Sequence, residues 1–341
     1  MITKFYKDSP TYVNVQYPDT DLNLELKKGK PTDSWMKNWT QEQRLEKYFE
    51  FCHAWDKRED ELLAQDYQIF SHRLHWHEHP FCDLMRTFDN LRDILCYCIT
   101  FSFSNEHWGT INRLINEGID NTKEHFQSNR HARNDLFQIY YPKGTNVKEW
   151  LLDGPQRAAD SLYHKLENLE RPYTMMEFAK LLEKYFKDEQ NFRSPLYPCK
   201  NTARYLAMSY PNLVDPNSVL YGGTGHFDGL QQIFSGTNLN GKVKYEIDTN
   251  GQFVTLNKHG ETWLNQMKML CEDKRSPIIE QKMLNHEDKT CFFYKHIAIT
   301  HSVKKPTKRI PYNWIFPNEF NLAKHPNDNI ILNGYGYTKV K

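Results

Sequence analysis

Apolar residues recur at helical spacing along most of the chain, and this periodicity limits the possible folds more than any other feature. A capping box, Thr40 with Gln43 three residues later, begins the first helical pattern. A second capping box, Thr174 with Glu177, begins another, and the segment 88–103 is apolar on most faces, as expected of a buried central helix. The sequence therefore predicts a mainly α protein.

One further segment has a β pattern and five more have helical ones. Apolar and polar residues alternate over 242–257 around Asn250-Gly251, a dipeptide typical of type I′ turns, so we expect a small β-hairpin insert there. The additional helices are predicted at 104–118, 147–169, 200–210, 261–271 and 278–301.

Local composition divides the chain into three parts. Residues 1–31 are polar and contain three prolines, so we expect an irregular N-terminal arm. Residues 32–302 form the predicted helical region, and residues 303–341 form a basic C-terminal tail.

The overall composition supports a folded, aromatic core. Hydrophobic residues make up only 39% of the 341 residues, but 20 Phe, 20 Tyr and 8 Trp supply large rings that fill a core at low entropic cost. No stretch reaches the ~18 apolar residues of a membrane span, and the N-terminus lacks the apolar region of a signal peptide. Seven Cys without a Cys-x-x-Cys pair predict reduced thiols. We therefore expect a cytoplasmic protein with no membrane partner.

A glycine-rich segment is the strongest candidate for a functional site. Gly222-Gly223-Thr224-Gly225 precedes a helix predicted from Phe227, and such a segment lets backbone N–H groups approach an anion at a helix N-terminus. Asp228 is expected in the first turn, with His226 beside it. One interpretation is a phosphate site with an adjacent carboxylate, and the other is a plain tight turn with Asp228 as an N-terminal charge.

Four pieces of the sequence around and beyond these glycines match a known group of proteins. They are TARYL at 202–206, VLYGGTGH at 219–226, FDGLQQIF at 227–234 and LNHEDKTCF at 284–292. With these pieces the chain resembles the helical, DNA-glycosylase-like domain of phage thymidine-hypermodification proteins. This group comprises the amino acid:DNA transferases, also called α-glutamyl/putrescinyl thymine pyrophosphorylases, and the helical domain attached to hydroxymethyluracil-DNA kinases. Thr224 stands where the group has proline, and Tyr197-Pro198-Cys199-Lys200 stands in place of its Gly-rich hairpin.

The resemblance implies a helix-hairpin-helix, DNA-glycosylase-like fold and a specific reaction. A hydroxymethyluracil-DNA kinase first places pyrophosphate on 5-hydroxymethyluracil in double-stranded DNA. The present chain then displaces the pyrophosphate with the amine of a free amino acid or polyamine, after the base has been flipped out of the duplex. Mg²⁺ is a candidate cofactor for the leaving pyrophosphate.

The resemblance also implies roles for particular side chains. Asp228 or Glu287 would act as the base or ammonium anchor, with His226 as a second candidate. The turn Gly222 to Gly225 would bind pyrophosphate or DNA phosphate. The cations implied at these phosphates are Lys200, Arg204 and, in reserve, Lys289.

Three histidines at alternate positions form a weaker, metal-binding candidate. His75, His77 and His79 would share one face of an extended segment, and three imidazoles can hold Zn²⁺ or Fe²⁺. The alternative is a polar loop before Pro80, because no further ligands at an established spacing can be identified.

A basic, aromatic stretch near the C-terminus is a candidate for DNA contact. The net charge is only +1, but a local basic face matters more for nucleic acid than the total charge. Cations beside stackable rings suit a DNA backbone and an exposed base, and the alternative is a solvated loop. The residues concerned are Lys304, Lys305, Lys308, Arg309 and Trp314.

Missing motifs and two open alternatives complete the functional predictions. The chain has no Gly-x-x-x-x-Gly-Lys-Ser/Thr loop, dinucleotide-binding Gly-x-Gly-x-x-Gly or Gly-x-Ser-x-Gly elbow, which disfavours P-loop kinases, dinucleotide oxidoreductases and serine hydrolases. Besides the transferase, a DNA glycosylase or lyase of the same architecture remains open. So does a non-catalytic DNA-binding or phage-assembly protein.

Overall fold

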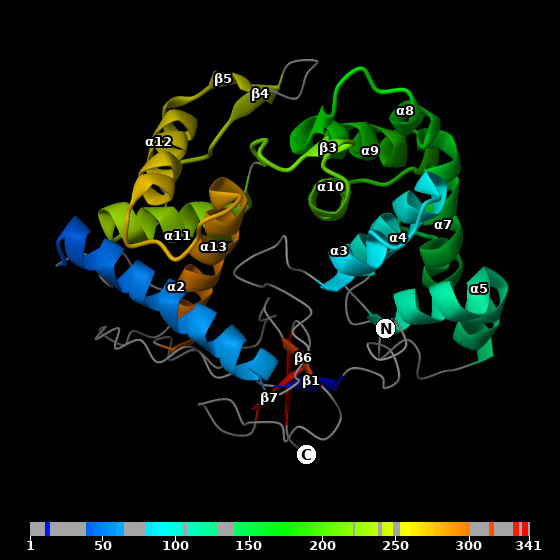
Figure 1. Ribbon diagram of the computed structural model, residues 1–341, viewed down its shortest axis with the longest axis horizontal. Coiled ribbons are helices and arrows are strands. Elements are labelled where there is room, and N and C mark those ends of the chain that lie inside the picture. The colour runs from blue at the N-terminus through cyan, green and yellow to red at the C-terminus, as the bar shows by residue number, and fades with distance from the viewer. Residues whose placement is uncertain are drawn as a thin grey trace. The chain divides into compact units, whose positions relative to one another are not determined.

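A computed structural model describes residues 39–64, 80–104, 108–128, 140–220, 222–237, 241–247 and 253–300, with short strands at 11–13, 314–316, 330–333 and 336–339. These residues are mainly helical, which confirms the predicted fold class (Figure 1). They form two compact units. Unit 1 comprises the described residues between 80 and 220, and unit 2 comprises the other described residues. The region 32–302, expected as one helical part, thus contributes to both units.

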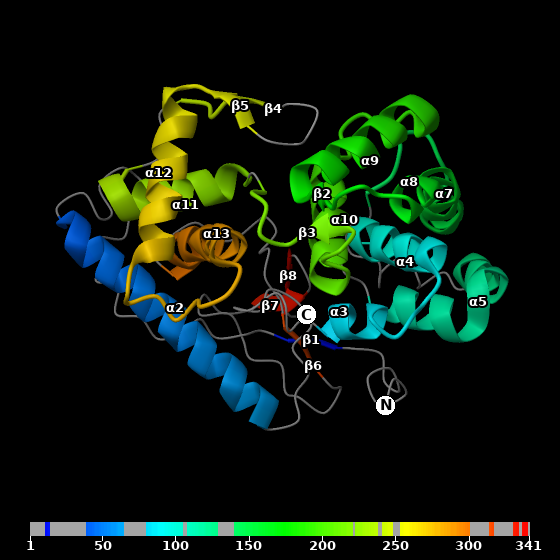
Figure 2. The ribbon, with the colours of Figure 1, turned by 45° about the horizontal axis from the view of Figure 1, so that its top comes forward.

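In unit 1, helices pack around α4, which is the buried central helix that the sequence predicts. Nine of its residues are buried, and α4 packs against both α7 and α10 (Figure 2). A short β2 strand pairs in parallel with β3. The elements are α3 (Pro80–Met85), α4 (Leu91–Phe103), α5 (Trp108–Ser128), α7 (Val147–Leu162), α8 (His164–Glu167), β2 (Tyr173–Thr174), α9 (Met175–Gln190), α10 (Leu196–Ser209) and β3 (Val214–Asp215).

Aromatic rings fill the core of unit 1, as the composition predicts. Phe81 stacks on Phe101 with ring centroids 4.0 Å apart, and Tyr205 packs edge-on against Phe81 at 5.1 Å. A second group joins Phe103 to Phe186 at 4.5 Å. These four Phe and the Tyr are completely buried, so large rings replace the missing aliphatic side chains.

Capping residues set several helix boundaries. Both predicted capping boxes are present: Thr40 Oγ1 accepts from Gln43 N at 3.2 Å, and Thr174 Oγ1 accepts from Glu177 N at 3.1 Å. The helix expected to end near Gly118 does end there, because Gly118 has φ 78° and ψ 174°, outside the helical range. A second helical segment follows the kink to residue 128, and α5 comprises both segments.

Unit 2 is organised around α13, which packs against α11, α12 and α2. The predicted hairpin is confirmed as β4 paired antiparallel with β5, whereas its turn lies outside the described residues. Two more antiparallel pairs, β1 with β6 and β7 with β8, belong to this unit. The elements are β1 (Thr11–Val13), α2 (Gln41–Ala64), α11 (Thr224–Ser235), β4 (Tyr245–Ile247), β5 (Phe253–Leu256), α12 (Lys258–Glu272), α13 (Lys282–Thr300), β6 (Trp314–Phe316), β7 (Ile330–Asn333) and β8 (Gly336–Lys339).

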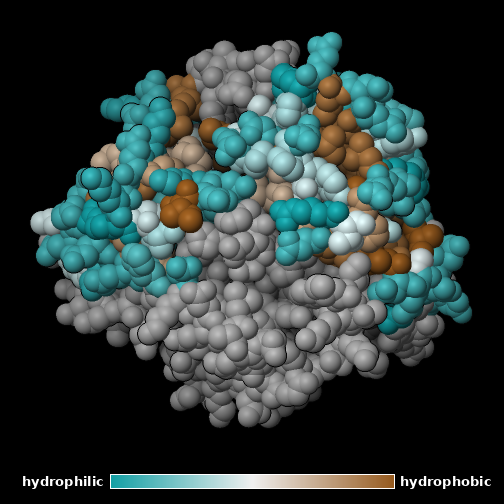
Figure 3. Space-filling model, viewed as in Figure 1, coloured by the Kyte–Doolittle hydropathy of each residue, from teal (hydrophilic) through white to brown (hydrophobic). Residues whose placement is uncertain are grey.

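The surface of the described residues is largely polar. Figure 3 shows hydrophilic residues over most of the coloured face, broken by separate apolar patches.

All seven cysteines are free, as predicted. No helix in the described ranges is both long and apolar enough to cross a lipid bilayer. The large apolar side chains that are exposed are Tyr141, Tyr197, Met269 and Ile279.

Candidate functional site

Helix α11 begins three residues earlier than the sequence predicts. Gly223 is the N-cap, with extended backbone angles, and its carbonyl accepts from the N–H groups of His226 at 3.1 Å and Phe227 at 3.2 Å. Thr224 and Gly225 therefore belong to the first helical turn. The prediction that Asp228 lies in that turn is wrong, and its interaction with the helix dipole is weak because the dipole acts mainly within the first turn.

Gly222 allows a close approach between the start of α11 and helix α13. A Cβ atom at this position would lie 2.2 Å from Cδ2 of His226 and 2.9 Å from Oε1 of Glu287. Such distances are far below van der Waals contact, so only glycine fits without a shift. At Gly223, by contrast, a Cβ would have no heavy atom within 4 Å. The glycines thus have different roles: Gly222 admits Glu287, and Gly223 leaves the N-terminus of α11 open.

His226 is completely buried, and both of its ring nitrogens have partners. The indole Nε1 of Trp263, on α12, donates to Nε2, while Nδ1 lies 2.5 Å from Oγ1 of Thr290. An indole can only donate, so Nε2 accepts, and the proton of the neutral ring lies on Nδ1. Oγ1 of Thr290 in turn donates to the carbonyl of Glu287 at 2.9 Å. This chain of hydrogen bonds connects three helices.

Asp228 lies near Tyr294 of α13. The pKa of Tyr294 is raised to about 12, mainly by burial and next by the negative charge of Asp228. One residue further along α11, a Cβ at Gly229 would come 2.1 Å from the carbonyl oxygen of Thr290, so the two backbones nearly touch there. We call this contact, made by Gly222, His226, Asp228 and Gly229 with Glu287, Thr290 and Tyr294, the α11–α13 seam.

The first half of α13 carries an unusual run of buried polar residues. His286 is buried between Tyr48, whose hydroxyl lies 2.8 Å from Nδ1, and Ser276, whose Oγ lies 3.1 Å from Nε2. Burial lowers the pKa of His286 to about 3, so the ring is neutral near neutral pH. Buried polar runs are costly and often mark functional sites. The run comprises Asn285, His286, Glu287, Asp288, Lys289 and Thr290.

Lys289, the reserve cation, is completely buried within this run. Its Nζ lies 3.8 Å from Oδ2 of Asp288. On the α2 side, burial raises the pKa of Cys52 to about 12, and the positive charge of Lys289 opposes that rise. Lys289 therefore lies close to Cys52 and α2.

Helix α11 is held at its other end by Arg44 of α2. The buried guanidinium donates from Nε to the carbonyl of Ile233 and from Nη2 to that of Phe234, both at 2.9 Å. These carbonyls lie in the last turn of α11, where a cation also complements the helix dipole. Arg44 thereby holds the C-terminal end of α11 against α2.

The other predicted site residues lie elsewhere or outside the described residues. Lys200 and Arg204 are on α10, in unit 1, with Lys200 half-buried and Arg204 buried. Trp314 belongs to strand β6. No group of three or more His, Cys, Asp or Glu residues within the described ranges could hold a metal ion. The candidates outside these ranges are His75, His77, His79, Lys304, Lys305, Lys308 and Arg309.

The site in unit 2 therefore combines an open helix N-terminus, two carboxylates on the α11–α13 seam and a neutral, fully engaged imidazole. Sequence patterns indicated Gly222, His226 and Asp228, and the family resemblance indicated Glu287. They did not indicate Trp263, which occupies an ordinary apolar position of an amphipathic helix. No protein-family model, no curated protein and no solved structure matches the chain, so its glycosylase-like architecture and its chemistry stay predictions.

Proposed function

We propose that the chain is a DNA base-modifying transferase that replaces the pyrophosphate of 5-pyrophosphoryloxymethyl-deoxyuridine in DNA with an amino acid or amine. One observation supports this most: the carboxylate of Glu287 lies next to the uncapped N-terminus of α11. The reaction expels an anion and takes in a cation. A site for it needs hydrogen-bond donors and a carboxylate side by side.

The N-terminus of α11 suits the leaving pyrophosphate. Gly223 brings no side chain to cap the helix, and the space around its Cα is open. The first N–H groups of a helix, together with its dipole, bind phosphate groups. These fixed donors would stabilise the negative charge that develops on pyrophosphate as its bond to the base methylene breaks.

The carboxylates suit the incoming amine. An ammonium ion must lose a proton before its nitrogen can attack the methylene carbon. In the proposed step the nitrogen–carbon bond forms, the carbon–oxygen bond breaks, and pyrophosphate leaves with the electron pair. We assign the proton to Glu287, with Asp228 as the second candidate on the same seam. One or two carboxylates are enough for Mg²⁺ when phosphates supply other ligands, and the same two residues would hold it.

We assign His226 a positioning role. With Nε2 accepting from Trp263 and Nδ1 directed at Thr290, the ring has no nitrogen available for an amine. Through Thr290 it instead holds the backbone of α13 at Glu287. The imidazole thereby keeps the start of α11 and the carboxylate of Glu287 in register.

The proposed partners follow from the same reaction. The substrate is double-stranded DNA already treated by a hydroxymethyluracil-DNA kinase, and the target base is flipped out at a cost of a few kcal/mol. Lys200 and the basic stretch 304–309 are the proposed phosphate contacts, whereas Arg204 is buried in α10 and is not one of them. A cytoplasmic location belongs to this proposal.

Nucleoside mass spectrometry tests the proposal directly. The full chain is incubated with kinase-treated 5-hydroxymethyluracil DNA and a pool of amines. The DNA is then digested to nucleosides, and their masses are measured. The mass of an added amine on the nucleoside supports the transferase. An abasic site would instead favour the glycosylase or lyase, and an unchanged nucleoside would favour a non-catalytic DNA-binding protein.

Charge-neutral variants test the assigned residues. We expect Glu287→Gln to lose at least ~100-fold in rate, as is usual when a general base is removed, and Asp228→Asn to lose activity as well. The matched control is Glu272→Gln, an exposed carboxylate on α12. Wild-type turnover of Glu287→Gln at an unchanged melting temperature would remove Glu287 from the mechanism.

A further inference from the structure

Helix α11 carries an aromatic ring one turn after its N-cap. Phe227 follows Gly223 by four residues, and its N–H donates to the carbonyl of Gly223 at 3.2 Å. Helical side chains lean toward the N-terminus of their helix, so the ring of Phe227 leans back toward Gly223. Phe227 is half-buried, whereas Gly223 is exposed, and a Cβ there would have no heavy atom within 4 Å. Part of Phe227 and the space at Gly223 are therefore accessible to a ligand.

Two neighbouring rings hold Phe227 in place. The indole of Trp263 meets the phenyl ring edge-on, with centroids 6.2 Å apart and planes at 80°. The imidazole of His226 lies 5.4 Å away at 50°. Both neighbours are buried and joined to each other by a hydrogen bond. The ring is thus preorganised, which lowers the entropic cost of binding a ligand against it.

The position of Phe227 along α11 suits the arm of the proposed substrate. One turn of an α-helix rises about 5.4 Å. The arm, a methylene group followed by two linked phosphates, spans a comparable length. With its terminal phosphate at the first N–H groups of α11, the pyrimidine would reach the level of Phe227. Glu287, next to Gly222, lies at the same end of the helix.

We propose that the extruded pyrimidine stacks on Phe227, which makes this residue a substrate-binding residue of the transferase. Proteins hold unpaired bases by stacking them on aromatic side chains, and such stacking tolerates substituents on the base. A stacked pyrimidine would keep its methylene carbon near the carboxylate that takes the proton from the amine. The inference rests on the proposed function, which supplies the extruded base and its arm.

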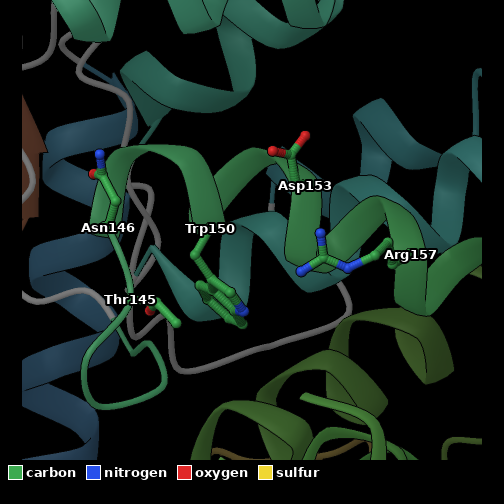
Figure 4. A pocket seen from close by; sticks show the side chains of 5 residues that line it. All are labelled: Thr145, Asn146, Trp150, Asp153 and Arg157. Atoms are coloured by element: carbon green, nitrogen blue, oxygen red, sulfur yellow. The ribbon is translucent and has the colours of Figure 1, made fainter. Parts of the chain in front are cut away.

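The pocket of unit 1 offers no comparable surface. This pocket, of about 290 Å³, lies along α7 and is lined by Trp150 and by the polar residues Thr145, Asn146, Asp153 and Arg157 (Figure 4). Trp150 is only 4% exposed, and its indole Nε1 donates to Oε1 of Gln190 at 2.8 Å. A base in this pocket would meet polar side chains and little of the indole.

An oligonucleotide with a single base isolates the stacking. The full chain is titrated with two short single strands, one made only of abasic residues and one with 5-iodouracil at a central position. Phosphate contacts are the same in both, so the ratio of the two affinities, the base effect, measures contact with the base. We expect wild type to bind the strand with the base at least ~5-fold more tightly, as is usual for a base–aromatic stack.

Variants assign the base effect to one ring. Phe227→Leu keeps an apolar side chain without a ring and should abolish the base effect, whereas Phe227→Tyr should retain it. The matched control is Phe88→Leu, since Phe88 is also half-buried but belongs to unit 1. Three results would overturn the inference: no base effect in wild type, an equal base effect in wild type and Phe227→Leu, or loss of the effect in Phe227→Tyr or Phe88→Leu.

Photo-cross-linking keeps the inference testable if Phe227→Leu fails to fold. Near-ultraviolet light joins 5-iodouracil to an aromatic ring stacked on it: the carbon–iodine bond breaks, a carbon–carbon bond forms, and hydrogen iodide leaves. In wild type we expect the cross-linked peptide to contain Phe227. A cross-link confined to other residues would overturn the inference. One such residue is Tyr294, the half-buried ring beside Asp228.

The two proposals fail separately. A base effect that depends on Phe227, without a mass gain on kinase-treated DNA, upholds the stacking and removes the transferase. A mass gain together with equal base effects in wild type and Phe227→Leu does the reverse.

Discussion

The indole of Trp263 and the imidazole of His226 form a hydrogen bond that decides where the histidine proton lies. Because the indole only donates, Nε2 of His226 must accept, and its Nδ1 carries the proton toward Thr290. The ring cannot become protonated on Nε2 unless this contact breaks. A fully buried histidine is thus held neutral by its partners, and it holds three helices together.

Removing the indole donor should destabilise the fold. Trp263→Phe leaves Nε2 of His226 buried without its donor, and we expect the free energy of unfolding to fall by about 1–3 kcal/mol, plus a smaller loss from reduced packing. Urea denaturation measures this. In a double-mutant cycle with Thr290→Val, we expect a coupling above about 0.5 kcal/mol, because both residues bind the same ring. Strictly additive losses would mean that the chain of hydrogen bonds does not act as a unit.

The two adjacent glycines should respond very differently to alanine. Gly222→Ala forces its methyl group into His226 and Glu287, and we expect a loss of about 1–3 kcal/mol in the free energy of unfolding. Gly223→Ala is the matched control, since open space surrounds its Cα and its backbone is extended. Alanine is a poorer N-cap than glycine, which lowers the free energy of unfolding, but it also makes the unfolded chain less flexible, which raises it. The two effects should cancel to within about 0.5 kcal/mol. Similar losses in both variants, measured by urea denaturation, would contradict the close approach at Gly222.

His286 should make stability depend on pH. Its pKa is about 3 in the folded chain because of burial, against ~6.5 in an unfolded one. Above ~6.5 both states are neutral and the full stability is present. Below that value only the unfolded chain takes up the proton, so the free energy of unfolding falls by up to about 1.4 kcal/mol per pH unit until the pH approaches 3.

A variant isolates this contribution. His286→Gln keeps polar groups near Tyr48 and Ser276 but cannot titrate. Between about pH 3 and ~6.5 its free energy of unfolding should therefore change less steeply with pH than that of the wild type, by the uptake of about one proton. The control is His164→Gln, because the side chain of His164 is 65% exposed and no such burial acts on it. Parallel pH profiles for wild type and His286→Gln, from urea denaturation at several pH values, would show that His286 is not buried in the neutral form.

Local signals explain which parts of the fold could be predicted. The capping boxes at Thr40 and Thr174 depend only on residues three positions apart, and the structure confirms both. The periodicity of 88–103 predicted the buried helix α4, because a helix that is apolar on most faces must be surrounded by protein. Neither prediction required knowledge of distant contacts.

Long-range contacts explain what could not be predicted. The start of α11 at Thr224 was missed because Gly-Thr-Gly has little helical propensity, and contacts with α12 and α13 hold that turn in place. The need for glycine at position 222 depends on the closeness of Glu287, and the tautomer of His226 depends on its hydrogen bond with Trp263. The pocket at Trp150 likewise depends on Gln190 of another helix, and no local pattern marks it.

Arg44 should be the most sensitive cation of unit 2 to a conservative change. Its guanidinium donates to the carbonyls of Ile233 and Phe234 and also to that of Trp39, a fork that a lysine ammonium cannot reproduce. We expect Arg44→Lys to lower the free energy of unfolding by about 2–3 kcal/mol, because buried carbonyls of α11 would lose their donors. The control is Arg113→Lys, whose exposed pair with Glu117 should contribute less than about 0.5 kcal/mol. If urea denaturation gave equal midpoints for the two variants, Arg44 could not be what fixes the C-terminal end of α11.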